Sequence, residues 1–265
     1  MVPTDPAPEL FHGATVLGPL TRSVGDAALM LDVLAGTGET AASFVAAASR
    51  PPRRLRIAVS WRIPWSPLPA RLDPEVRAAV ERLAGVLAGL GHELIDEDPR
   101  YRASVLNVVP RLAVGLCDHV QLVPDRTVLD PRTRENARMA RLMRGPGLAL
   151  ARATERRLAR RIGAIFRRAD VVLTPTTALP PPTAGASLRL SLRETNRATI
   201  AAAGGYTVPW NAVGWPAINV PAGLTEAGLP VGAQLLGPAD SEPLLLALAA
   251  QLEQSERWHE RWPPV

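Results

Sequence analysis

Cysteine, histidine and clustered carboxylates are the side chains of this sequence that could act as nucleophiles, metal ligands or proton carriers. Cys117 and His119 stand two positions apart, but each step along a helix turns the side chain by about 100°, so this spacing does not favour a Cys–His catalytic pair. We interpret Cys117 as a small buried apolar residue. The four histidines are far apart and show no metal-binding spacing. We therefore expect no metal site, and no cofactor is indicated.

Three neighbouring carboxylates, Asp96, Glu97 and Asp98, precede Pro99. Paired carboxylates can exchange protons as a general acid and a general base. The polar end of a strand that stops before a proline explains the same residues. We interpret them in this second way.

The basic residues set a further limit on the chemistry, because all thirty are arginine and the 265 residues contain no lysine. An arginine side chain has a pKa above about 12 and stays protonated near neutral pH, so it cannot act as a general base. The sequence also lacks the hydrolase motif G-x-S-x-G, the Walker loop, the dinucleotide motif G-x-G-x-x-G and the zinc-protease motif H-E-x-x-H. The common enzyme signatures are therefore absent.

A net charge of +5 raises the question of a nucleic-acid partner. Arginines are concentrated between residues 132 and 168, beside an apolar stripe at helical spacing formed by Leu158, Ile162, Ile165 and Phe166. This pattern predicts an amphipathic helix with a solvated basic face. No nucleic-acid-binding signature accompanies it, so we expect no nucleic-acid partner.

Length and composition predict one folded domain over residues 1–265, since 47% of the residues are hydrophobic and can form a sizeable core. No apolar stretch approaches the roughly 20 residues that cross a bilayer, and the first residues lack the pattern of a secretion signal. The single cysteine fits a reducing compartment. We expect a cytoplasmic protein with no membrane partner.

The chain alternates between patterns of strands and helices, which predicts an α/β fold. Apolar runs predict strands near residues 55–61, 92–97, 171–173, 217–220 and 231–236, with a turn at 221–223 after the fourth. Periodicity and capping residues, Ser23 and Asp73 among them, predict helices near residues 21–36, 73–91 and 241–253. They also predict a helical region between 101 and 169 with breaks at its prolines and glycines.

Several segments resemble the amidase signature family, and they occur in the family order. The segments are residues 18–28 (GPLTRSVGDAA), 56–59 (RIAV), 73–76 (DPEV), 173–176 (LTPT), 211–223 (NAVGWPAINVPAG) and 228–237 (GLPVGAQLLG). The resemblance extends from about Gly18 to the end of the chain. It implies a mixed central sheet flanked by helices and, in the complete fold, hydrolysis of amide carbon–nitrogen bonds.

The same resemblance places the catalytic groups outside this chain. The family uses a serine nucleophile, a second serine in a cis peptide and a lysine, all in a Gly/Ser-rich half that precedes the segment matching residues 18–28. We therefore expect an incomplete fold with no catalytic residue of its own, inactive alone. The expected partners are a separately encoded amino-terminal half or a second copy, and a small-molecule amide once the fold is complete. A truncated gene, a split enzyme and a late start codon all stay open.

The residues expected to contact a substrate are Trp210, Asn211 and Trp215. They combine apolar bulk, an amide and nearby glycines, as the wall of a pocket does. Core packing of the tryptophans before a buried strand is the alternative interpretation. If half of the fold is missing, an exposed apolar face or unpaired strand edges should be visible. A covered sheet with a retained pocket would instead indicate a non-catalytic binding protein on an amidase scaffold.

Overall fold

The computed structural model describes residues 10–37, 43–64, 71–101, 104–202 and 205–262, and in this part of the chain five strands form one sheet. The strands are β1 (Arg56–Val59), β2 (Glu93–Asp96), β3 (Val171–Pro175), β4 (Ala217–Leu224) and β5 (Pro230–Leu236), in the order β2-β1-β3-β5-β4. β1 is parallel to β2 and to β3, whereas β5 is antiparallel to β3 and to β4. The predicted mixed sheet is confirmed.

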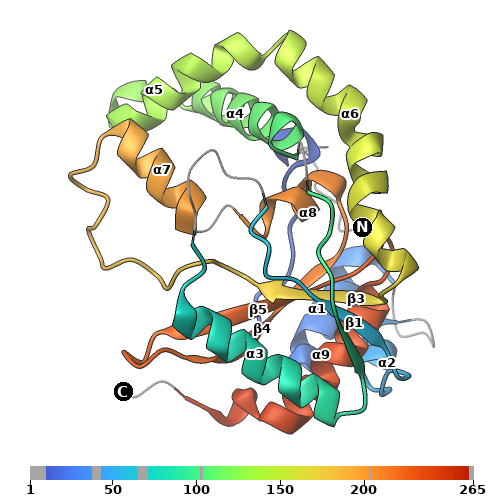
Figure 1. Ribbon diagram of the computed structural model, residues 1–265. Coiled ribbons are helices and arrows are strands. Elements are labelled where there is room, and N and C mark those ends of the chain that lie inside the picture. The colour runs from blue at the N-terminus through green and yellow to red at the C-terminus, as the bar shows by residue number, and fades with distance from the viewer. Residues whose placement is uncertain (1–9, 38–42, 65–70, 102–103, 203–204, 263–265) are drawn as a thin grey trace.

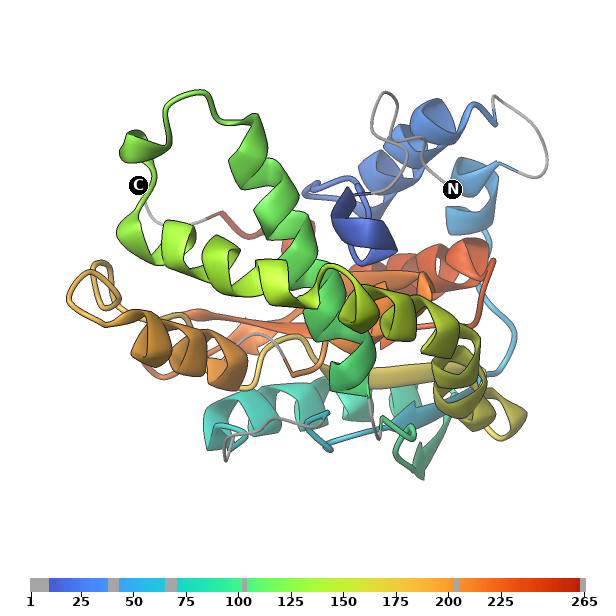
Figure 2. The ribbon, with the colours of Figure 1, turned by 90° about the horizontal axis from the view of Figure 1, so that it is seen from above.

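Helices cover the sheet in two layers (Figure 1). One layer contains α1 (Val24–Ala35), α2 (Phe44–Ala48), α3 (Pro74–Gly89) and α9 (Glu242–Glu256). The other contains α4 (Ser104–Leu122), α5 (Pro131–Ala140), α6 (Pro146–Ile162), α7 (Leu192–Ala202) and α8 (Val208–Val213). Seen from above, α4 and α6 lie next to each other over the sheet (Figure 2). None of the described helices is long and apolar enough to span a membrane.

Sequence signals explain where the principal helices begin. Ser23 caps α1 by accepting a hydrogen bond from the Asp26 amide, and Gly36 ends it in the left-handed conformation with φ 67°. Asp73 caps α3, with Pro74 in its first turn. The expected breaks in the central helical region are present, since α4 ends before Pro124 and both α5 and α6 begin at a proline.

The predicted end of the fourth strand is wrong. β4 does not turn at residues 221–223 but continues to Leu224, with a register shift between Pro221 and Gly223. Proline lacks an amide hydrogen, yet an edge strand tolerates it because one side of the strand has no neighbour. β4 is such an edge strand.

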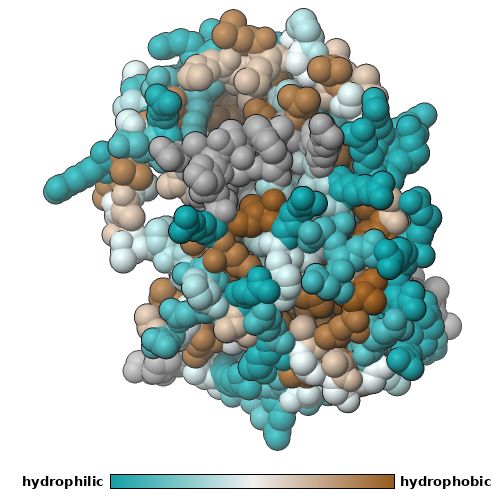
Figure 3. All heavy atoms as spheres, in the orientation of Figure 1, coloured by the Kyte–Doolittle hydropathy of each residue, from teal (hydrophilic) through white to brown (hydrophobic). Residues whose placement is uncertain are grey.

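Two apolar clusters form the core, one on each face of the sheet. The first packs β-strand residues such as Val59 and Leu235 against α1, α3 and α9. The second packs Ala58, Val172 and Leu236 against α6 and α8. The predicted apolar stripe of the arginine-rich region lies here, with Leu158, Ile162 and Ile165 buried and Phe166 half-buried. Hydrophilic groups cover the outer side of α6 (Figure 3).

Candidate functional site

A row of polar side chains crosses the sheet beside the second apolar cluster. We call Ser60, Thr174, Gln234 and Asn219 the polar row. Thr174 and Asn219 lie directly opposite Gln234 on its two neighbouring strands, and the Ser60 amide extends the pairing of β1 by donating to the Leu173 carbonyl at 2.9 Å. Because alternate residues of a strand share a face, this row points toward the layer of α4, α6 and α8.

The buried members of the polar row have hydrogen-bond partners within the chain. Gln234 Nε2 donates to Thr174 Oγ1 at 2.9 Å, and Thr174 Oγ1 donates to the Pro175 carbonyl at 2.9 Å. Ser60 Oγ donates to Asp98 Oδ1 at 2.7 Å. Burial without such partners would destabilise the fold. These contacts make the row a rigid part of the scaffold.

Asn219 and Thr176 form the exposed end of this polar surface. The Thr176 hydroxyl hydrogen-bonds to Asn219 Oδ1, and Gly232 lies directly beneath them. A Cβ atom at Gly232 would lie 2.7 Å from Asn219 Oδ1 and 3.0 Å from Thr176 Oγ1. Glycine at this position therefore allows the two side chains to meet over the strand.

The polar row lies at the carboxyl ends of the parallel strands β1 and β3, where open α/β sheets bind ligands. Its two hydroxyl residues, Ser60 and Thr174, are fully buried. The hydroxyl of Ser60 donates to a carboxylate, Asp98, and that of Thr174 donates to a backbone carbonyl. The row forms a polar surface on the sheet.

The acidic run has the structural role that we expected of it. Asp98 accepts hydrogen bonds from Ser60 and from the Arg62 amide, and Glu97 forms an ion pair with Arg168 at 3.2 Å. The carboxylates thus have separate partners and do not form an acid–base pair.

Cys117 is buried, and its sulfur atom has different hydrogen-bond partners from the imidazole ring of His119. Gln121 Nε2 and Arg144 Nη2 lie 3.5 and 3.7 Å from its sulfur atom. Burial raises the pKa of the Cys117 thiol, but the hydrogen bonds from Arg144 and Gln121 lower the pKa by a larger amount, so the net shift is downward. His119 instead bonds to the Gly115 carbonyl. The structure does not bring Cys117 and His119 into a pair.

The expected substrate contacts lie on and just after α8. Trp210 is 1% exposed, and its Nε1 donates to the Tyr101 hydroxyl at 3.3 Å. The Trp215 ring lies 6.3 Å from the Trp210 ring, centroid to centroid, and is half-buried. Asn211 is also half-buried, and its side chain has no hydrogen bond to the described residues. The structure brings the two tryptophans together and leaves Asn211 and Trp215 partly accessible.

Two buried phenols, Tyr101 and Tyr206, contact α8 and the segment after β1 respectively. Burial raises the pKa of Tyr101 and of Tyr206, and the negative charge of Asp98 adds to the rise. Both groups therefore stay neutral. Tyr206 donates to the Trp61 carbonyl at 2.8 Å, which fixes the segment after β1.

Arg111 positions α8, a role that no sequence pattern predicted. It is 2% exposed, its Nη1 donates to the Ala212 carbonyl at 2.8 Å, and its Nη2 pairs with Glu155 of α6. An arginine within a helix is ordinarily a surface residue. Only the tertiary structure shows that this one reaches the end of another helix.

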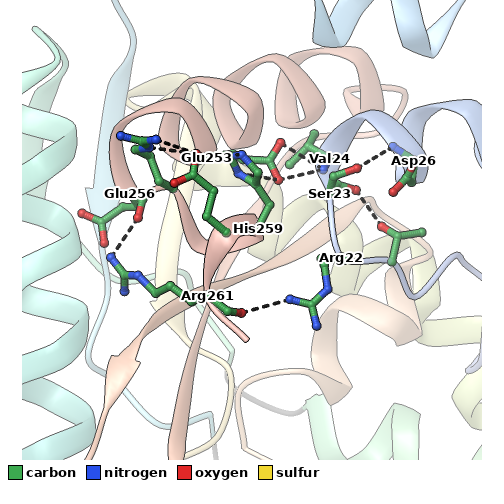
Figure 4. Close-up of polar contacts among 11 residues, drawn as sticks. Arg22, Ser23, Val24, Asp26, Glu253, Glu256, His259 and Arg261 are labelled. Atoms are coloured by element: carbon green, nitrogen blue, oxygen red, sulfur yellow. Dashed lines mark hydrogen bonds and ion pairs between the residues drawn. The ribbon is translucent and has the colours of Figure 1, made fainter. Parts of the chain in front are cut away.

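The segment at residues 18–28 joins the start of α1 to α9 and to the residues just after α9 (Figure 4). The Val24 amide, at the first turn of α1, donates to both carboxylate oxygens of Glu253 on α9, at 3.1 and 3.2 Å. Arg22 donates to the Arg261 carbonyl at 3.0 Å and lies 3.7 Å from the centroid of the Trp262 ring. A carboxylate at a helix N-terminus is favourable because of the helix dipole. The polar residues of this segment are thus structural.

Apolar side chains of the same region point outward. Leu20 is 98% exposed and Val33 of α1 is 74% exposed, and Val16, Leu17 and Leu29 are also exposed. β2 and β4 form the two edges of the sheet. In the part of the chain that the structure describes, the sheet thus has two edge strands, and several apolar side chains between residues 16 and 33 are exposed.

Comparisons with known proteins agree on one family. The Amidase family model matches residues 1–246. A protein named putative amidase AmiA2 of Mycobacterium tuberculosis is 43% identical over 274 residues, covering 100% of this chain and 56% of that protein. A 6-aminohexanoate-cyclic-dimer hydrolase of Pseudomonas sp. is 28% identical, covering 96% of this chain and 56% of that protein.

The solved structures give the same result. The structure of a 6-aminohexanoate cyclic dimer hydrolase superposes with a TM-score of 0.77 at 27% identity, covering 92% of this chain and 55% of that one. A bacterial aryl acylamidase shares the fold with a TM-score of 0.70 at 18% identity, covering 94% of this chain and 55% of that one. The chain spans just over half the length of the relatives that it matches.

Proposed function

Because this chain belongs to the amidase signature family, we propose that it forms the carboxy-terminal part of an amide hydrolase whose catalytic residues lie on another polypeptide segment. The reaction is hydrolysis of an amide carbon–nitrogen bond, with the serine, the cis-peptide serine and the lysine of the family supplied by that segment. One observation carries the proposal: the chain aligns over its full length with 56% of a relative and contains no lysine.

The surface of the chain supports this division. Exposed apolar side chains recur between residues 16 and 33, among them Leu20 and Val33, and the polar residues Arg22 and Ser23 of the same segment are already bonded within the chain. What stays available for an interface is therefore apolar area. We propose that the complementary segment covers these apolar side chains in a cytoplasmic enzyme that has residues 1–265 as one domain.

The substrate is proposed to be a small-molecule amide. Asn211 and Trp215 are partly accessible on and just after α8, and they would supply an amide hydrogen-bonding group and apolar contact area. One relative is named 6-aminohexanoate-cyclic-dimer hydrolase, and we propose a substrate of similar size. This chain would then bind and orient the amide, while the complementary segment attacks it.

The proposal is tested by isolating the protein from its native source and measuring its intact mass, any copurifying chain and its release of ammonia or amine from small amides. We expect either a polypeptide heavier than 28.3 kDa or a second, lysine-containing chain, together with amide hydrolysis. An inactive 28.3 kDa chain without a partner would contradict the proposal and favour the binding-protein alternative. Hydrolysis by the chain alone would refute the assignment of catalysis to another segment.

A matched pair of variants tests the proposed interface in the isolated assembly. Leu20→Glu places a charge on the apolar face, whereas Leu142→Glu places one at a leucine that is 87% exposed in the helical layer on the other side of the sheet. We expect the first substitution to weaken assembly and the second to leave it unchanged. Equal effects of the two variants would show that the face around Leu20 is not the interface.

A further inference from the structure

The edge strand β4 directs a row of backbone groups away from the sheet. In the antiparallel pairing of β4 with β5, the Gly237 amide donates to the Pro216 carbonyl at 3.1 Å. Bonded and non-bonded residues alternate along such a pair. Ala217 and Asn219, one and three positions after Pro216, therefore direct their N–H and C=O groups away from β5. The described part of the chain places no further strand on that side.

The first half of β4 has little protection against pairing with another strand. Proteins usually protect an edge strand by keeping it short or by placing charged side chains on it. β4 has eight residues, Ala217–Leu224, and none of them is charged. Pro221 lacks an N–H at the next outward position, which confines complete pairing to the residues before it. We call residues 217–220 the open edge.

The opposite edge of the sheet differs in each of these properties. β2 has only four residues, Glu93–Asp96, and its first and last residues carry carboxylates. Charged residues at this density disfavour a neighbouring strand. The sheet therefore has one protected edge, at β2, and one open edge, at β4.

The two faces of β4 show which side chains would fit beside it. Val220 and Ala222 are buried in the first apolar cluster, against α3 and α9. Ala217, Asn219 and Pro221 lie on the opposite face and are exposed, so the layer of α4, α6 and α8 does not cover this strand. A strand added to β4 would fit with apolar side chains next to Val220 on one face and small or polar side chains next to Asn219 on the other.

We propose that the open edge pairs with a β-strand of the complementary segment, so that the sheet continues across the interface. The inference rests on the proposed function, which supplies that segment. The relatives have room for it, because this chain spans 56% of one and 55% of another. The Ala217 and Asn219 amides donate to carbonyls of the added strand, and their own carbonyls accept from its amides. The added strand thus lies beside Asn219, at the exposed end of the polar row.

Hydrogen exchange resolved to single amides tests the proposal, in the 265-residue chain alone and in the assembly isolated from the native source. In the chain alone we expect the Ala217 and Asn219 amides to exchange rapidly. In the assembly they should exchange at least about tenfold more slowly, because a bonded amide exchanges only when the strand opens. The Ile218 amide, which is directed toward β5, should be protected in both samples.

Two proline variants provide a matched comparison of the edges. Ala217→Pro removes an outward N–H and leaves the bonds to β5 in place. Asp96→Pro does the same on β2, because the Glu93 amide donates to the Leu55 carbonyl and alternation directs the Asp96 amide outward. In the assembly, Ala217→Pro should speed exchange of the Asn219 amide at least about tenfold and Asp96→Pro less than about twofold. Circular dichroism verifies that both variants are folded.

The possible outcomes separate this inference from the proposed function. An assembly that hydrolyses amides while the Ala217 and Asn219 amides exchange as rapidly as in the chain alone would overturn the inference and leave the proposed function intact. Equal effects of the two proline variants would also overturn it. Slow exchange of these amides in a dimer of the chain alone would show that a second copy covers the open edge instead. An inactive 28.3 kDa chain without a partner would contradict the proposed function, and the inference with it.

Discussion

Gly163, at the end of α6, lies against the ring of Trp215 and gives the sharpest test of how the α8 region is packed. A Cβ atom at Gly163 would lie 2.3 Å from Cη2 and 3.0 Å from Cζ3 of Trp215. Carbon atoms in favourable contact are about 3.5–4.0 Å apart. The ring cannot easily retreat, because the Phe166 and Trp210 rings lie 5.7 and 6.3 Å from it, centroid to centroid. Gly163→Ala therefore overpacks this cluster.

The expected magnitude follows from two opposing effects. Overpacking costs about 1–3 kcal/mol, while alanine favours the helical backbone of position 163, with φ −66°, by about 0.5–1 kcal/mol. We expect Gly163→Ala to lower the free energy of unfolding by roughly 1–2 kcal/mol. In a Trp215→Ala background the clash is gone, so the same substitution should raise it by about 0.5–1 kcal/mol.

The assay is urea unfolding followed by far-UV circular dichroism, which does not depend on the tryptophan that is removed. Gly85→Ala in α3 is the control, since a Cβ atom there meets no atom within 4 Å, and it should stabilise both backgrounds equally. The coupling between Gly163→Ala and Trp215→Ala is expected to be about 1–3 kcal/mol. Additive effects of the two substitutions would refute the close contact between Gly163 and the Trp215 ring.

Three further predictions concern other contacts. Glu253→Gln replaces the carboxylate that accepts the Val24 amide and should lower the free energy of unfolding by about 0.5–1 kcal/mol, measured by urea unfolding at neutral pH. Burial raises the pKa of Asp32, but its hydrogen bonds, including the one from the Phe44 amide, lower the pKa by a larger amount, so the net shift is downward. The stability that Asp32 provides is therefore fully present above the unfolded-state pKa and is lost as the pH falls through the folded-state pKa. The free energies of unfolding of the wild type and of Asp32→Asn, measured as the pH is lowered, should therefore converge at low pH. A difference that stays constant with pH would contradict this. If the chain is part of the proposed amide hydrolase, Asn211→Ala should raise KM for small amides, and an unchanged KM would remove Asn211 from the proposed substrate contacts.

The sequence predicted local features better than features that join distant segments. The caps at Ser23 and Asp73 are determined by neighbouring residues, and both are present as expected. The polar row was not predicted, because Ser60, Thr174 and Asn219 belong to segments separated by more than forty residues each and meet only through the strand register. Local periodicity carries no information about that register.

Trp210 and Arg111 show the same limit in individual side chains. The loop composition that indicated a pocket wall also fits the buried packing that surrounds Trp210. A helical arginine gave no signal, although its bond to the Ala212 carbonyl fixes the end of α8. Which side chain of an amphipathic helix lies beneath a neighbouring element is decided by tertiary packing.

For the proposed amide hydrolase, the absence of lysine from the sequence and the hydrogen bonds of the polar row are consistent with reacting groups on another segment. The buried hydroxyl and amide groups of the row are bonded to one another and to Asp98, so activating any of them would require breaking a buried hydrogen bond, which costs about 1–3 kcal/mol. Arginine cannot supply the neutral base either. Asn219 and Thr176, at the exposed end, are the groups that stay near solvent. A catalytic segment that docks on this chain would therefore contact the polar row as a rigid surface. Its reacting groups would reach the row at the exposed end, where Asn219 and Thr176 lie.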